Sequence, residues 1–196
     1  MSQLTPTRAA ALELGDERRA MREGHAFLDE KCLLLASEML LQLARYAQLE
    51  SEVDQAQGDA LAALRSAVAR HGLDGLQIYP VPTLEARLDV RMHRLMGVPL
   101  HDAKLELRVQ PQRDGPFASP EAKSCATAFG ALSIVAAQLA AVTGNLLRLH
   151  REYERSVRRA RALHDVLLPE LDGELRDMET RLEELEQEDA IRMRGT

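Results

Sequence analysis

The sequence is poor in the side chains that usually build compact cores and chemical sites. Aromatic residues make up 3% of the 196-residue chain, tryptophan is absent, and there are two cysteines. A compact core or an aromatic-lined pocket usually draws on more rings than this. Cys32 and Cys125 lie far apart among apolar neighbours in helical patterns. This predicts reduced, packed thiols without a CxxC motif.

Motifs for catalysis and cofactor binding are also missing. The chain has no GxxxxGK[ST] or GxGxxG loop for a phosphate, and no HExxH or GxSxG sequence. His25, Asp29 and Cys32 share one helix face at a spacing that metal ligands use. His25 and Cys32 fall in an apolar seam, however, which favours packing over metal binding. We therefore expect no catalytic residue, no metal site, no cofactor and no independent enzyme.

Charge and hydropathy exclude further classes. The net charge of −6 argues against a general nucleic-acid binder. The N-terminus lacks the basic and then apolar pattern of a signal sequence. No apolar run reaches the about 18 residues of a membrane span, and residues 126–142 come closest. The sequence thus predicts a soluble, cytoplasmic protein without a membrane-inserted segment.

Alanine, leucine, arginine and glutamate dominate instead, which is typical of long helices and coiled coils. Residues 7–70 contain no proline and follow a seven-residue apolar repeat, which predicts a helix that supercoils with a partner. One column of this seam is Leu14, Met21, Leu28, Leu35, Gln42, Leu49, Ala56 and Ala63. The other is His25, Cys32, Met39, Tyr46, Val53, Ala60 and Ala67. Such a helix needs a partner face, because propensity alone does not stabilise it in water.

The middle of the chain has a different character. Six of the eight prolines fall between Pro80 and Pro120. Apolar residues alternate over residues 84–92 and again over 103–109, which predicts a β-hairpin with a somewhat long turn. The glycine-rich residues 71–75 are expected to end the first helix, and residues 119–121 to open the next one.

The helical period returns from residue 121 to residue 194. Its seam changes phase where Leu163, Leu167, Leu171 and Leu175 follow one another at steps of four, a stutter that locally unwinds a left-handed supercoil. Pro169 lies inside this stutter, although a proline within a helix costs roughly 3 kcal/mol. The proline therefore falls where the winding already changes.

These patterns predict a mainly α fold, a long antiparallel two-helix coiled coil with a small insert at one end that contains a β-hairpin. The expected segments are an N-terminal helix over residues 1–72, the insert over 73–120, and a C-terminal helix over 121–196.

A basic run marks the second helix. Its members are Arg148, Arg151, Arg155, Arg158, Arg159 and Arg161. It is either a solvated helix face or a contact collar for an acidic protein partner. The charge pattern leaves two classes of function open: a mechanical or scaffolding coiled coil, and a regulatory module that docks a partner.

Several motifs, taken in order, resemble the D subunit of the V-type and archaeal-type rotary ATPases. The N-terminal SQLTPTR, the Gly24-His25 pair with Leu28 and Lys31, and the LMGVP segment at residues 95–99 resemble its opening and its hairpin turn. The strongest match is the RRARALHDVLLP segment at residues 158–169, followed by Glu188-Asp189 and Arg192. That family also carries the proline.

The resemblance implies a non-catalytic central-stalk protein that transmits torque in an ATP-driven or ATP-making ion pump. Its expected partners are the hexameric ring of A and B subunits, the F subunit, and the C (or d) subunit of the membrane rotor. The expected location is cytoplasmic, peripheral to the inner membrane. The collar arginines, together with Arg192 and Arg194, are the candidate partner interface. The alternative is a coiled-coil scaffold or tether unrelated to ATPases.

Overall fold

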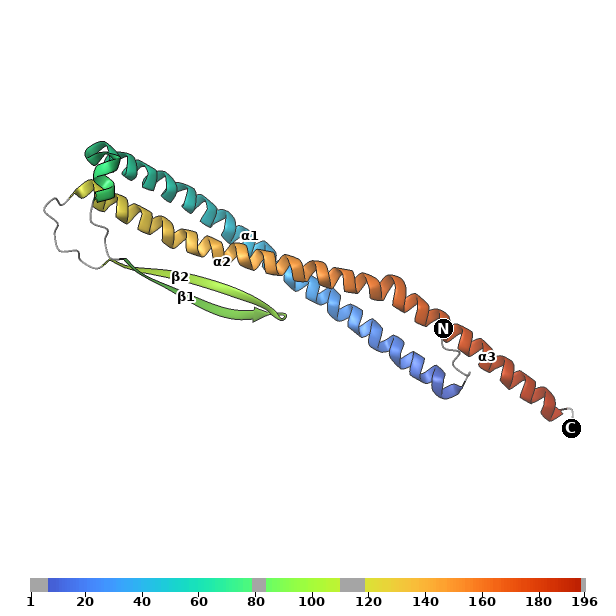
Figure 1. Ribbon diagram of the computed structural model, residues 1–196. Helices are drawn as coiled ribbons and strands as arrows, with labels where there is room; N and C mark the ends of the chain where they lie inside the picture. The colour runs from blue at the N-terminus through green and yellow to red at the C-terminus, as the bar shows by residue number, and fades with distance from the viewer. Residues whose placement is uncertain (1–6, 79–83, 110–118, 195–196) are drawn as a thin grey trace. The chain divides into compact units, whose positions relative to one another are not determined.

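The computed structural model describes residues 7–78, 84–109 and 119–194, which are mainly helical (Figure 1). Helix α1 (Arg8–Ile78) is followed by an antiparallel hairpin of β1 (Leu84–Leu95) and β2 (Val98–Val109). Helix α2 (Pro120–Ala162), the π-helical segment η1 (Leu163–Leu167) and helix α3 (Leu168–Arg194) then follow without a break. The predicted fold class is confirmed: two long helices with a small hairpin between them.

The chain forms two compact units, and each contains part of both long helices. The terminal unit comprises residues 1–36 and 152–196, and the hairpin unit comprises residues 37–151. This division differs from the three consecutive segments expected from the sequence, because packing joins residues across the helix pair rather than along one helix. Each unit is described separately below.

The terminal unit is an antiparallel helix pair with an apolar core. Three ion pairs show the antiparallel order, because residue numbers rise along the first helix as they fall along the second. The pairs are Arg8 with Glu186 at 2.6 Å, Arg18 with Asp172 at 3.2 Å, and Lys31 with Glu152 at 2.6 Å. The buried core consists of Ala10, Leu14, Leu171, Leu175 and Met178. Leu14 is a predicted seam residue, and its burial confirms its inward position.

The helix ends follow local capping chemistry. Thr7 Oγ1 accepts a hydrogen bond from the Ala10 N–H at 3.2 Å, so Thr7 caps α1. Gly72, with φ 70°, breaks α1 where the sequence predicted its end, but helical turns resume and continue to Ile78. Ser119 Oγ accepts from the Ala122 N–H at 3.2 Å, which confirms the predicted start of the second helix.

The hairpin has longer strands and a tighter turn than the sequence predicted. The strands contain 12 residues each, and Met96 and Gly97 alone connect them. Both turn residues have positive φ, 47° and 86°, as a type I′ turn requires. The expectation of a long turn over residues 93–102 was wrong because the strands extend beyond the alternating runs at 84–92 and 103–109. Pro99 faces Arg94 in a pair that exchanges no ladder hydrogen bonds, so its missing N–H costs nothing there.

The phase change near Pro169 takes the form of a π turn. The Leu168 N–H bonds to the Leu163 carbonyl, five residues back, so η1 holds one more residue per turn than its neighbours. Leu167, which the sequence placed in the seam, is 40% exposed, whereas the following residue, Leu168, is less exposed. The wider turn gives the proline ring room, because a regular α-helix would press it against the Asp165 carbonyl.

One expectation about hydropathy is corrected. The continuous helix Pro120–Arg194 contains an 18-residue window with mean hydropathy 1.8, which is long and apolar enough to cross a membrane by composition. Only 6% of that window is buried. The residues between Lys123 and Arg148 carry no charge. The Thr, Ser, Gln and Gly among them lower the mean hydropathy too little to exclude a membrane span by composition. The hairpin unit therefore exposes an unusually apolar helix.

Candidate partner interface

The arginine run is divided between the two units. Arg155, Arg158, Arg159 and Arg161 belong to the terminal unit and are exposed near the C-terminal end of α2. Arg155 lies 3.5 Å from Glu152, with 62% of its side chain exposed. Exposed guanidinium groups of this kind make weak, salt-screened contacts. Arg192 and Arg194 are likewise exposed in the last turn of α3.

Arg148 has a different role from the rest of the run. Its Nε donates to the Pro99 carbonyl at 2.9 Å, and its Nη2 donates to Asn145 Oδ1 at 2.6 Å. The side chain is half-buried against the turn end of the hairpin. Arg148 thus stabilises the fold of the hairpin unit, and its guanidinium is already engaged by main-chain and side-chain oxygens.

Asn145 completes this attachment of the hairpin to α2. Its Oδ1 accepts from the His101 N–H at 2.8 Å, and its Nδ2 donates to the His101 carbonyl at 2.9 Å. These two bonds copy the pairing of a neighbouring strand at the outer edge of β2. Because Asn145 is 1% exposed, its amide would be costly to bury without them. On α1, Arg45 adds an ion pair to Asp102 at 3.0 Å.

In the terminal unit, Lys31 and Glu152 form the least exposed ion pair among the described residues. Their nitrogen and oxygen lie 2.6 Å apart, and 13% and 20% of the two side chains is exposed. The hydrogen bond from Lys31 lowers the pKa of Glu152 below its ordinary 4.5, against an opposing effect of burial. The pair links α1 to α2 in a single register.

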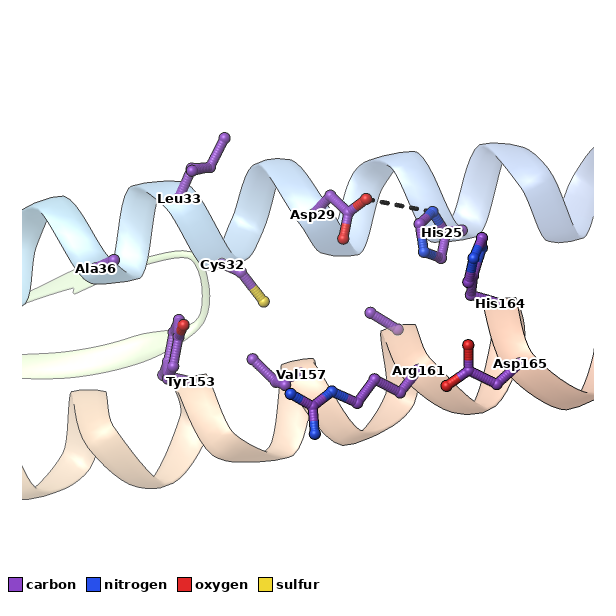
Figure 2. Close-up of a pocket in the computed structure, with 11 residues that line it drawn as sticks. His25, Asp29, Cys32, Leu33, Ala36, Tyr153, Val157, Arg161, His164 and Asp165 are labelled. Atoms are coloured by element: carbon purple, nitrogen blue, oxygen red, sulfur yellow. Dashed lines mark ion pairs between the residues drawn. The ribbon is translucent and has the colours of Figure 1, made fainter.

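The terminal unit also contains a cavity of about 480 Å³ beside the π turn (Figure 2). His25 and His164 come from the two helices, with ring centroids 5.2 Å apart. His25 Nδ1 lies 3.3 Å from Asp29 Oδ2, and the Cys32 sulfur points toward the facing helix. Burial is the main cause that raises the pKa of the Cys32 thiol. Arg161 also lines this cavity.

Over the described ranges, no three His, Cys, Asp or Glu side chains are placed so that they could hold a metal ion. The observed partial burial of His25 and Cys32 agrees with the seam position favoured from the sequence. The thiol, with its raised pKa, is a poor nucleophile near neutral pH.

The two faces of the hairpin differ sharply. On one face every cross-strand pair along four positions joins opposite charges: Glu85 with Arg108, Arg87 with Glu106, Asp89 with Lys104, and Arg91 with Asp102. The other face is apolar. On β2 it is half-buried, and Leu107 Cδ1 lies 3.4 Å from the position of a Cβ built on Gly130 of α2. On β1 it is open: Leu88 is 55% exposed, Val90 49% and Met92 58%.

The sequence reasoning missed two of these features. Asn145 stood in the sequence as a polar interruption of an apolar run, and only the register of β2 reveals its partners. The complementary charges of the two strands were readable in the sequence, but only a two-residue turn aligns them. A strand pairing built on that turn would have aligned these charges, whereas the place of Asn145 beside β2 depends on how α2 packs against the hairpin.

Comparisons with known proteins give one consistent match. A family model that describes the D subunit of ATP synthase matches residues 10–195. The D subunit of the A-type ATP synthase of Pyrococcus furiosus is 30% identical over 198 residues, which cover 96% of this chain and 91% of that protein.

Two further relatives have similar coverage. The D subunit of the A-type ATP synthase of Desulfurococcus sp. is 29% identical, over 96% of this chain and 91% of its own length. The D subunit of the V-type ATP synthase of Anaeromyxobacter sp. is also 29% identical, over 99% of this chain and 95% of its own. The match therefore includes both units described above.

Proposed function

Since this chain belongs to the family of ATP synthase D subunits, we propose that it is the central rotor shaft of a V/A-type ATPase and carries torque rather than catalysing a reaction. It would turn inside a ring of A and B subunits. It would also bind the F and C (or d) subunits, on the cytoplasmic side of the membrane that holds the ion-translocating rotor.

One observation carries this proposal. In the terminal unit, two antiparallel helices enclose an apolar seam and present alternating charges outward, with ion pairs bridging them at several levels. A paired helix resists bending and twisting better than a single one, as transmission of torque requires. Its exposed arginines make contacts that salt screens easily, so they would not fix a turning shaft at one angle.

The hairpin unit suits a different part of the same role. Its exposed apolar helix window and the open face of β1 offer surface that a soluble protein usually covers with a lasting partner. We assign the contacts with the F and C (or d) subunits to this unit. The weakly binding terminal unit is assigned to the ring.

Co-purification tests the proposal. A tagged copy of this chain, expressed in its native host and recovered at moderate salt, should bring down A-, B- and F-type subunits, and the eluate should hydrolyse ATP. Recovery of the chain without ATPase subunits at every salt concentration would contradict the proposal. It would favour a scaffold with an unrelated role.

A further inference from the structure

The outer edge of β1 is a regular, uncovered strand edge. All 12 pairs of the hairpin are in continuous register, so no bulge twists this edge away. In an antiparallel pair, alternate residues direct both main-chain groups away from the partner strand. The turn sets this alternation, so the outward groups belong to Ala86, Leu88, Val90, Met92 and Arg94. Among the described residues, these groups make no main-chain hydrogen bond outside the hairpin.

Two of the usual protections of an edge strand, proline and lysine, are also missing, although charged side chains alternate along its other face. Residues 84–95 contain no proline and no lysine, and every side chain described from Glu85 to Arg94 is exposed. The apolar side chains Leu88, Val90 and Met92 lie on the same residues whose main-chain groups point outward. A strand that pairs here would therefore gain hydrogen bonds and extend the apolar face in one step.

The charges of β1 indicate which strand fits. Along the other face, β1 alternates in sign from Glu85 through Arg87 and Asp89 to Arg91. If two copies of β1 pair antiparallel with Leu88 opposite Leu88, then Arg87 faces Asp89 and Glu85 faces Arg91 of the second copy. Every directly opposed pair joins opposite charges, and apolar residues meet on the other face.

Neighbouring registers are unfavourable. Moving one β1 strand by two residues in one direction places Arg87 opposite Arg91 and Asp89 opposite its own copy. Moving it the other way places Arg87 opposite itself and Glu85 opposite Asp89. Like charges directly opposite one another destabilise a sheet. A slip by one residue would place apolar side chains opposite charged ones. Of these neighbouring registers, only the one centred on Leu88 pairs opposite charges along the whole charged face.

We propose that two copies of the free chain associate through β1, in an antiparallel pair centred on Leu88, to form a four-stranded sheet of two hairpins. This association concerns the chain outside the ATPase. A partner that docks on this strand during assembly would compete with it. The inference does not depend on the proposed function, because it is a property of the isolated chain.

The test uses the isolated full-length chain in sedimentation velocity and native mass spectrometry at low salt over a concentration series. The wild type should shift from the 21.8 kDa monomer to twice that mass as concentration rises. In Leu88→Pro, the dimer should be lost with unchanged helical circular dichroism, because the missing N–H points away from β2. As a control, Leu73→Asp alters another exposed leucine and should leave the dimer intact.

A charge exchange tests the register itself. Arg87→Glu should place two acids in contact in its own dimer, and Asp89→Lys should place two bases in contact, so each variant alone should be monomeric. When the two variants are mixed, the introduced glutamate of one copy faces the introduced lysine of the other, and the dimer should return. Recovery in the mixture cannot arise from damage to either hairpin. A monomeric wild type at all concentrations would overturn the proposal, and so would a dimer that survives Leu88→Pro or a mixture that stays monomeric.

Discussion

The two units differ in the apolar surface that they leave exposed. The terminal unit buries leucine, methionine and alanine together with polar Ser156, and it meets solvent with charged side chains and with scattered apolar ones such as Leu12 and Ile191. The hairpin unit also buries apolar residues such as Val142 and Leu149, with polar Gln42 on α1 and with Asn145 bonded to the edge of β2, but it leaves an apolar helix window and the open face of β1 exposed. The first unit is complete as a helix pair. The second leaves exposed the kind of continuous apolar surface that a binding partner usually covers. Its buried polar groups specify register more than they add stability.

The largest effect should come from the apolar core of the terminal unit. Leu175→Ala removes a side chain that is 7% exposed and leaves a cavity. We expect the free energy of unfolding to fall by about 2–4 kcal/mol. Urea unfolding followed by circular dichroism measures this loss, with Leu12→Ala, at a leucine that is 73% exposed, as the matched control. Equal effects of the two variants would show that the terminal unit has no enclosed core.

The next effect tests the polar core of the hairpin unit. Asn145→Ala leaves the His101 N–H and carbonyl without their partners, at an expected cost of about 2 kcal/mol. Amide hydrogen exchange should speed up selectively at the turn end of β2. Ser133→Ala is the control on the same helix, because its hydroxyl bonds only to the Phe129 carbonyl. Unchanged exchange at His101 in Asn145→Ala would mean that this asparagine does not hold the hairpin.

A smaller effect, dependent on pH, should come from the Lys31–Glu152 pair. Lys31→Met removes the shorter ion pair of a mostly buried carboxylate and leaves it only the longer contact with exposed Arg155 at 3.5 Å, so we expect a loss of about 1 kcal/mol at neutral pH. The pKa of Glu152 is lowered in the folded state, so its stabilising contribution is present above its ordinary 4.5 and disappears as the pH falls through the lower folded value.

Thermal unfolding between pH 7 and pH 3 measures this dependence. The wild type should lose stability in the acid range, and Lys31→Met should lose less over the same range. Arg19→Met serves as the control, because its side chain is 74% exposed in an ion pair on the surface. An identical loss of stability with falling pH in wild type and Lys31→Met would show that the Lys31–Glu152 pair does not cause this dependence.

The smallest effect on stability, and the one aimed at function, concerns the exposed arginines. The double variant R158E/R159E should change the free energy of unfolding by less than about 0.5 kcal/mol, since both positions are exposed. Assembly with ATPase subunits should weaken, most clearly at low salt. R19E/R65E makes the same change in charge elsewhere and should assemble normally. Intact assembly and coupling in R158E/R159E would exclude these arginines from the interface.

The sequence predicted what depends on local pattern. The seven-residue repeat identified the inward face of the first helix, including polar Gln42, which is 8% exposed. The repeat also located the phase change near Pro169. It did not show whether the helix accommodates this change as a stutter or as a π turn, because both give the same spacing of apolar residues. The two-residue turn was missed because methionine is an unusual residue at positive φ and Pro99 is an unusual strand residue.

The candidate interface was less predictable for a physical reason. Spacing alone cannot separate Arg148, which binds the Pro99 carbonyl, from Arg158, which lies in solvent. That distinction depends on a strand edge brought to α2 from a distant part of the sequence. Contacts with other subunits depend in turn on surfaces that this chain does not contain.

We propose that this chain turns while its ATPase hydrolyses ATP. The direct measurement is a single-molecule rotation assay on the reconstituted complex, with the ring of A and B subunits fixed to a surface and a bead attached to this chain. The bead should rotate stepwise in one direction and stop when ATP is removed. A complex that hydrolyses ATP at its full rate while a firmly attached bead stays still would contradict it.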